Sequence, residues 1–308
     1  MSTPNSSTTP SDRTCGHCGI SASSLPEGSN LSQCSRCKSA FYCNRECQSA
    51  AWAEDKPHCK RQNFVLKFHL CPQYIVNPPV IRTLSVPATA TLETLHKALQ
   101  IAFGWAGTHA YDFAVLDPAF EPPTAAEYME QGMKMDMRGD GMLGFEDPRE
   151  YIVRVVHKPE EYVRGYKIDR MHEGRRRHPR TEERRSDRTK VYELWGEKGF
   201  ADKAIEYTYD FGDNWVHVVT LEGRAPPTER IVCLSGTGHG VAEDIGSDQG
   251  WENLKKAYRT ANPDKEQRFA RRMYETKCIN GDKRGLGDGR EYEFKLEEVN
   301  AALARNGL

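Results

Sequence analysis

The hydrophobic positions between residues 64 and 104 recur with the periods of regular secondary structure. The segments 64–70 and 80–86 are rich in branched and aromatic residues, which predicts two strands of a hairpin. Residues 92–103 carry apolar side chains at helical spacing, between a candidate N-cap at Thr91 and a terminating Gly104. This part of the chain is therefore expected to contain two paired strands and a helix.

The remaining pattern predicts further strands and helices in an irregular order. Strands are expected at 109–116, 206–211 and 215–221, and helices at about 250–258, after the Asn262-Pro263 pair, and at about 296–304. Residues 117–190 show little periodicity and are expected to be loops and insertions. Because strands and helices do not alternate regularly, we expect an α+β fold with a largely antiparallel sheet.

The N-terminal part is dominated by cysteines instead. Seven of them lie within residues 15–59, and four form the Cys-x-x-Cys pairs Cys15/Cys18 and Cys34/Cys37. Such a pair brings two thiolates close enough to share a tetrahedral metal, so two pairs with further ligands imply two zinc ions. The segment is too short for a sizeable core, so metal binding would supply most of its folding free energy.

Further residues in the cysteine-rich segment match a known pattern. Tyr42 precedes Cys43, Gln48 follows Cys47, and Trp52 comes four residues later. Residues 15–59 thereby resemble the MYND-type zinc finger. The resemblance implies interleaved zinc ligands: Cys15, Cys18, Cys43 and Cys47 for one structural zinc, and Cys34, Cys37, a histidine and Cys59 for the other.

The histidine of the second zinc site departs from the family pattern. Its place after the tryptophan is taken by Asp55, and His58 lies beside Cys59. We expect His58 to be the ligand because imidazole is the commoner zinc ligand, with Asp55 as the alternative. A weakened or empty second site is a third outcome.

The MYND resemblance also implies a binding activity. Fingers of this family bind short proline-rich peptides of partner proteins. Gln48 would hydrogen-bond the peptide backbone, and Trp52 would stack on a proline. The competing interpretation makes Trp52 a packing anchor beneath the zinc site.

A second resemblance covers the larger region, about residues 64–305, with the irregular insertion at 117–190. It rests on four short segments, of which Tyr209-Asp210-Phe211-Gly212-Asp213-Asn214-Trp215-Val216-His217 is the most specific; the others are Thr91–Trp105, Thr108–Phe113 and Glu243–Trp251. Together they resemble the plasmid pRiA4b ORF-3-like domain. This resemblance implies an α+β fold, but it does not imply any established enzymatic reaction.

The same region contains residue types suited to metal-assisted hydrolysis. They are His109, Asp210, Asp213, His217, Glu243 and Asp244. If the fold gathered them, the domain could be a metal-dependent nuclease or hydrolase. Each also has a structural interpretation, since Asp213 suits a turn and His217 alternates with apolar residues of a strand.

Composition and charge narrow the choice of function. The chain has 308 residues, a net charge of −1 and 28% charged residues, so no global field favours nucleic acid or membrane. Residues 1–14 are rich in Ser, Thr and Pro and are expected to be a disordered tail, not a signal peptide. We therefore expect an intracellular adaptor, in the nucleus or cytoplasm, that docks a proline-rich protein partner. A third hypothesis, a transcription-associated regulator, rests on the arginines between Arg175 and Arg185.

Overall fold

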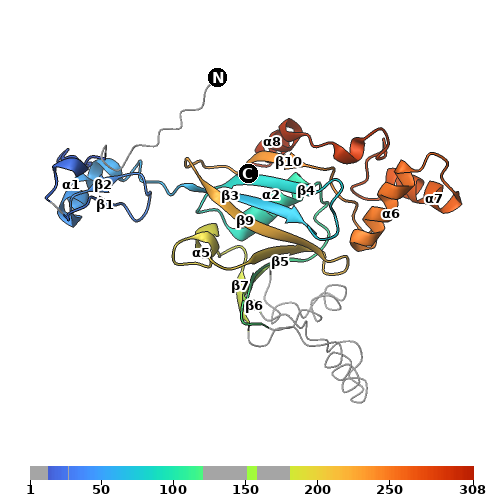
Figure 1. Ribbon diagram of the computed structural model, residues 1–308, viewed down its shortest axis with the longest axis horizontal. Coiled ribbons are helices and arrows are strands. Elements are labelled where there is room, and N and C mark those ends of the chain that lie inside the picture. The colour runs from blue at the N-terminus through green and yellow to red at the C-terminus, as the bar shows by residue number, and fades with distance from the viewer. Residues whose placement is uncertain (1–12, 27, 121–150, 158–180) are drawn as a thin grey trace, which may run out of the picture. The chain divides into compact units, whose positions relative to one another are not determined.

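The computed structural model describes residues 13–26, 28–120, 151–157 and 181–308 (Figure 1). The chain divides into two compact units. The smaller contains the chain up to Asn63 together with Pro226–Thr228, and the larger contains Phe64–Ala225 and Glu229–Leu308.

Among its described residues, the smaller unit has a short hairpin and the helix α1. Strands β1 (Ser32–Gln33) and β2 (Phe41–Tyr42) pair antiparallel, after a single 3-10 turn, η2, at Ala22–Ser24. Helix α1 (Arg45–Asp55) begins where the Asn44 side chain accepts a hydrogen bond from the Cys47 amide at 2.9 Å. Apart from Tyr42 and Ala51, the buried hydrophobic cluster of this unit is made of cysteines.

The larger unit is built on a sheet of eight strands among the described residues. The strands are β3 (Asn63–Leu70), β4 (Val80–Val86), β5 (Tyr111–Leu116), β6 (Tyr151–Val156), β7 (Glu182–Arg185), β8 (Ile205–Tyr209), β9 (Trp215–Ala225) and β10 (Val232–Thr237). Their order across the sheet is β10-β4-β3-β9-β8-β5-β6-β7. The β6–β7 pair is parallel, whereas the β3–β4, β4–β10, β5–β6, β5–β8 and β8–β9 pairs are antiparallel. The expected α+β class with a mostly antiparallel sheet is confirmed.

The predicted hairpin and the helix after it are also confirmed. Strands β3 and β4 pair with Phe64 opposite Val86, and helix α2 follows at Leu92–Phe103. The Thr91 hydroxyl accepts the Thr94 amide at 3.0 Å, and Gly104 ends the helix at φ +78°.

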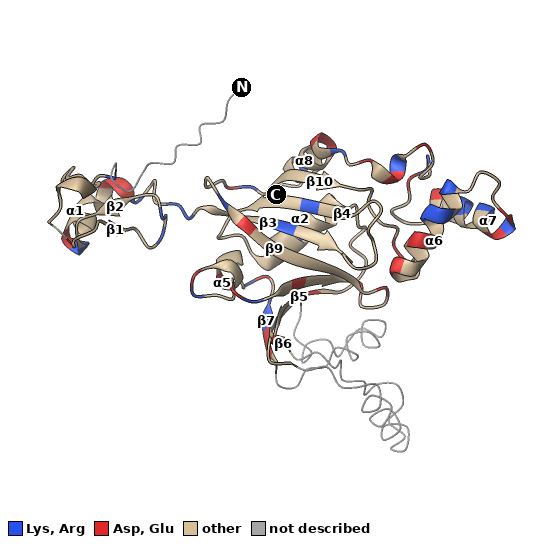
Figure 2. Ribbon diagram, in the orientation of Figure 1, with Lys and Arg blue, Asp and Glu red and all other residues tan. Residues whose placement is uncertain are grey.

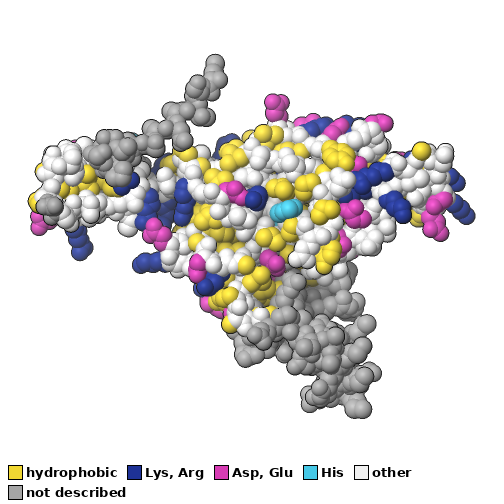
Figure 3. All heavy atoms as spheres, in the orientation of Figure 1, with side chains coloured by type: hydrophobic (Ala, Val, Ile, Leu, Met, Phe, Trp, Pro, Cys, Tyr) yellow, Lys and Arg dark blue, Asp and Glu magenta, His cyan; other side chains and the backbone are white. Residues whose placement is uncertain are grey.

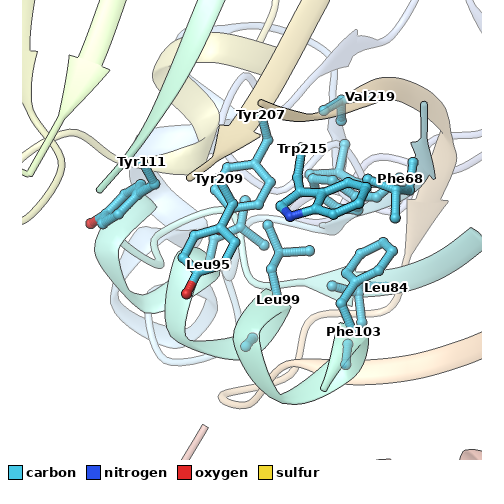
Figure 4. Packing of buried hydrophobic residues seen from close by; sticks show 14 of the residues in the cluster. Phe68, Leu84, Leu95, Leu99, Phe103, Tyr111, Tyr207, Tyr209, Trp215 and Val219 are labelled. Atoms are coloured by element: carbon cyan, nitrogen blue, oxygen red, sulfur yellow. The ribbon is translucent and has the colours of Figure 1, made fainter. Parts of the chain in front are cut away.

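Helix α2 packs its apolar side against the sheet. Leu95, Leu99 and Phe103 point toward Trp215 and Tyr207 on the neighbouring strands β9 and β8 (Figure 4). All five side chains are buried, and they form the centre of the main core. Because one face of the sheet and one stripe of the helix are apolar, their mutual burial is the main stabilising term of this unit.

Further helices lie between and after the strands. They are α5 (Val191–Trp195), α6 (Ser247–Arg259), α7 (Lys265–Thr276) and α8 (Leu296–Arg305), with a 3-10 turn, η6, at Arg290–Tyr292. Helix α7 follows the Asn262-Pro263 pair and is capped by Asp264 in a capping box with Gln267. Among the described residues, no helix is long and apolar enough to cross a membrane.

Residues 117–190, expected to be loops and insertions, also contain regular strands. Strands β6 and β7 lie in this region and extend the sheet beyond β5. Arg154 of β6 binds Asp112 of β5 through Nε and Nη2, both 2.9 Å from the same carboxylate oxygen, and both side chains are buried. Charged residues therefore occupy sheet positions that an apolar pattern does not reveal. The Met129–Met142 stretch lies outside the described residues.

Candidate functional site

Four cysteines converge at one end of the small unit. The Sγ atoms of Cys15, Cys18, Cys43 and Cys47 lie within 4.8 Å of one another. Cys18 Sγ and Cys43 Sγ are 3.4 Å apart, far longer than the roughly 2.05 Å of a disulfide. Two sulfurs bound to one tetrahedral zinc at about 2.3 Å would lie about 3.8 Å apart. The group therefore has the spacing of a thiolate metal site.

The thiols of this group differ in acidity. Burial opposes ionisation of Cys15, but backbone amides donate to its sulfur and lower its pKa to about 6. Hydrogen bonding to Cys18, together with burial, raises the pKa of Cys43 to about 12. Once one thiolate has formed, its neighbours resist ionisation because like charges repel. A bound dication would remove that repulsion and favour all four thiolates.

A second group contains Cys34, Cys37 and Cys59, all buried. Cys34 Sγ lies 3.7 Å from Cys59 Sγ. Burial tends to raise the pKa of Cys37, but hydrogen bonds from Ser39 and from backbone amides lower it to about 7. The two groups use cysteines from alternating stretches of the chain, so the thiol clusters interleave.

The residues considered for the fourth position of this group lie in different environments. His58 is exposed. Asp55 is half-buried, and its carboxylate accepts a hydrogen bond from the Tyr42 hydroxyl. Burial and this hydrogen bond raise the pKa of Tyr42, with smaller contributions from Cys34 and Cys37. Asp55 is therefore linked through Tyr42 to the three-cysteine group, a connection that spacing alone does not show.

A shallow groove lies along helix α1 and is lined by Arg45, Gln48, Ser49 and Trp52. These positions are three, four and seven residues apart, so they share one face of the helix. Gln48 and Trp52 were expected to line a peptide site, whereas Arg45 and Ser49 were not considered. A step of three residues back from Gln48 gives Arg45, and the same step back from Trp52 gives Ser49, so helical spacing would have identified both.

Gln48 and Trp52, the two residues expected to line a peptide site, also contact the cysteine-rich core of the small unit. Gln48 Nε2 donates to Cys34 Sγ at 3.6 Å. Trp52 is half-buried and packs against the cysteine-rich core. The Gln48 side chain therefore both lines the groove and contacts the three-cysteine group.

The larger unit brings together only part of the predicted hydrolytic set. His109, Asp210 and Asp244 offer ligand atoms within 4.8 Å of one another, and Glu243 lies beside His109. His217 is fully buried and bonds through Nδ1 to the Tyr207 carbonyl at 3.1 Å.

The Asp213 side chain accepts hydrogen bonds from backbone amides instead. Its Oδ2 atom accepts the amides of Ile245 and Gly246 at 3.1 and 3.2 Å. The quartet of His109, Asp210, Asp213 and His217 therefore does not form one site.

The arginine-rich segment gives no basic surface in the described part of the chain. Arg175–Arg180 lies outside the described residues, whereas Arg184 and Arg185 pair with Glu182 and Asp187. Helices α6 and α7 carry both signs of charge (Figure 2). On the face of the larger unit in Figure 3, acidic and basic side chains are interspersed.

A cysteine-rich finger followed by an α+β domain is thus the architecture of this chain. The chain belongs to the plasmid pRiA4b ORF-3-like protein family, which matches residues 64–283. Residues 15–59 match the MYND finger, so the predicted order of the two modules is confirmed. The MYND finger is a zinc-binding module for protein interaction.

Two curated proteins are similar to parts of the chain. The uncharacterized protein y4hQ of Sinorhizobium fredii is 27% identical over 184 residues, which cover 59% of this chain and 67% of that protein. A SET and MYND domain-containing protein of Dictyostelium discoideum is 41% identical over 46 residues, 15% of this chain and 8% of that protein.

A solved structure is also similar. It is a protein of unknown function, MM3350, from Methanosarcina mazei Go1, with a TM-score of 0.49 and 19% identity. The alignment covers 77% of this chain and 97% of that protein.

Proposed function

We propose that this protein is an intracellular adaptor whose finger docks a proline-rich segment of a partner protein. The groove on α1 carries the proposal, because it combines an aromatic side chain, Trp52, with an amide donor, Gln48. Proline-rich segments are already extended and lose little entropy on docking against an aromatic surface. The amide of Gln48 would bond the peptide backbone, which lacks internal hydrogen bonds.

Two structural zinc ions would hold the groove in shape. We assign one to Cys15, Cys18, Cys43 and Cys47, and the other to Cys34, Cys37 and Cys59 with a fourth ligand. His58 is proposed as that ligand and Asp55 is the alternative. With every position filled by protein, neither zinc would have an open coordination site for catalysis.

The ligand assignment is tested by metal content. Zinc-loaded protein should contain two zinc ions per chain by inductively coupled plasma mass spectrometry. The variants His58→Ala and Asp55→Asn should separate the alternatives, because only the true ligand should bring the content toward one. One zinc in the unmodified chain would contradict the two-ion assignment.

The docking proposal is tested by peptide binding to the zinc-loaded chain. Isothermal titration with a panel of proline-rich peptides should give saturable binding, and Trp52→Ala should weaken it at least tenfold. Glu54→Ala is the matched control, because Glu54 is exposed on the same helix and does not line the groove.

Zinc content must stay the same in both variants, so that a loss of binding reports on the groove and not on the fold. Absence of binding across the panel would overturn the proposal. Equal affinity of Trp52→Ala and the unmodified chain would overturn the assigned groove.

A further inference from the structure

His109 of the larger unit lies between carboxylates from two other segments. Its Nδ1 atom is 3.7 Å from Asp210 Oδ1, at the end of β8. Its Nε2 atom is 3.5 Å from Asp244 Oδ1 and 3.8 Å from Glu243 Oε2, both in the loop between β10 and α6. Three separate segments of the chain therefore place four ligand-type side chains close together.

These separations do not fit direct hydrogen bonding. N–H···O bonds measure about 2.7–3.2 Å, so each of the three contacts is too long. The Nε2 atom is also shielded from solvent and has no hydrogen-bond partner. A buried polar atom without a partner is costly. Two ligands bound to one ion at about 2.1 Å lie about 3.0–3.4 Å apart, so a small contraction would suit a shared ion.

The excess negative charge of the cluster also favours binding of a cation. Three carboxylates surround one imidazole, so a protonated His109 would still leave an excess of two negative charges. Within the described ranges, the ion pairs of Asp210, Glu243 and Asp244 involve His109 alone. Glu243 is fully buried, where an uncompensated charge is most expensive. A divalent ion would supply the missing positive charge.

Surrounding hydrogen bonds hold the buried carboxylate in place. Glu243 accepts from the Ala106 amide, from the Thr108 hydroxyl at 2.8 Å and from the Tyr209 hydroxyl at 3.0 Å. The backbone amide of Glu243 donates to Asn280 Oδ1 at 2.8 Å. Outer hydrogen bonds of this kind fix ligand orientation in metal sites.

The cluster is open on one side. The Asp244 side chain is 72% exposed and that of His109 is 27% exposed, whereas Glu243 closes the inner side. An ion bound here would keep coordination positions for water. This differs from a finger in which every position is filled by protein.

We propose that His109, Asp210 and Asp244, with Glu243 behind them, bind one divalent first-row metal ion. The donor set combines one imidazole with carboxylates, which suits Mn²⁺ or Zn²⁺ and does not resemble the thiolate groups of the finger. The site is independent of the peptide groove.

The test is a titration with Mn²⁺ of the full chain loaded with only two equivalents of zinc, the amount assigned to the thiolate groups, so that no excess zinc fills the proposed site. Binding is followed by the loss of the free Mn²⁺ signal in electron paramagnetic resonance. Mn²⁺ binds a given site more weakly than Zn²⁺, so it does not displace zinc from cysteine. One equivalent should bind with a saturable, sub-millimolar affinity. His109→Gln and Asp244→Asn should each weaken binding at least tenfold.

His239→Gln is the matched control. His239 also faces a carboxylate, with Nε2 3.7 Å from Asp282, but Arg284 already neutralises that carboxylate. The control should bind Mn²⁺ like the unmodified chain. Asp244 is exposed, so Asp244→Asn keeps the test valid if His109→Gln fails to fold. No saturable binding, or binding that neither variant changes, would overturn the proposal.

Discussion

Gln48 Nε2 donates to Cys34 Sγ at 3.6 Å, so a residue that lines the groove on α1 also contacts a sulfur of the three-cysteine group. Hydrogen bonds to a coordinating sulfur stabilise its negative charge and orient it. In this protein the shape of the groove on α1 and the zinc affinity of the three-cysteine group are therefore expected to depend on the same side chain.

Replacement of Gln48 tests that connection. Gln48→Leu keeps a similar volume and removes the donor, so it should lower zinc affinity of the Cys34 group about tenfold. Competition with a chromophoric chelator measures the change. Ser49→Ala is the control, because Ser49 lines the same groove without a bond to a thiolate in the structure. Equal zinc affinity in all three proteins would contradict the prediction.

Removal of metal should affect the two units differently. The buried cluster of the finger consists mainly of cysteines, whereas the larger unit has an extensive apolar core. Chelation should therefore unfold residues 15–59 and leave the larger unit folded. Hydrogen exchange by mass spectrometry should show lost protection in the finger alone, restored by zinc under reducing conditions. Protection of the finger retained in a metal-free sample would argue against this explanation.

The buried pair of Arg154 and Asp112 should be important for stability. Arg154→Leu would leave the Asp112 carboxylate buried without its main cation, at a cost of about 3–5 kcal/mol in free energy of unfolding. Urea denaturation measures this loss of unfolding free energy. Lys203→Ala breaks the exposed Lys203–Asp202 pair and should cost less than about 1 kcal/mol. Similar losses of unfolding free energy in both variants would show that burial does not determine how much these ion pairs contribute to stability.

The fully buried His217 and the half-buried His96 should make the larger unit sensitive to acid. Burial lowers the pKa of His96 and of His217 to about 3, whereas both would titrate near pH 6.5 in the unfolded chain. Below pH 6.5 the unfolded state binds protons that the folded state does not. The free energy of unfolding should therefore fall as the pH drops from about 6.5 toward 3, by up to about 1.4 kcal/mol per pH unit for each histidine.

Urea denaturation at several pH values tests this pH dependence. His217→Gln removes one of the two groups, so the slope of unfolding free energy against pH should become shallower by about 1.4 kcal/mol per unit. His157→Gln replaces an exposed histidine and should leave the slope unchanged. An unchanged slope in His217→Gln would mean that His217 takes up a proton in the folded state.

Several features of this protein follow from local sequence alone. The cysteine spacing and the residues around it identify the finger, because ligand geometry constrains neighbours along the chain. The strands at 64–70 and 80–86 and the helix after Thr91 follow from periodicity and capping, which are also local effects. The most specific segment, Tyr209 to His217, marks the larger domain for the same reason.

Other features depended on contacts between distant residues. Arg154 lies in a sheet strand despite its charge because Asp112 and Glu183 on the neighbouring strands neutralise it, whereas Arg184 of β7 pairs with Glu182 of the same strand. Asp213 and His217 resembled His109 and Asp210 as candidate ligands, yet only folding shows that the first two bond to backbone while the others face Asp244. A residue type indicates which bonds a side chain is able to form, but tertiary packing decides which partner lies within reach.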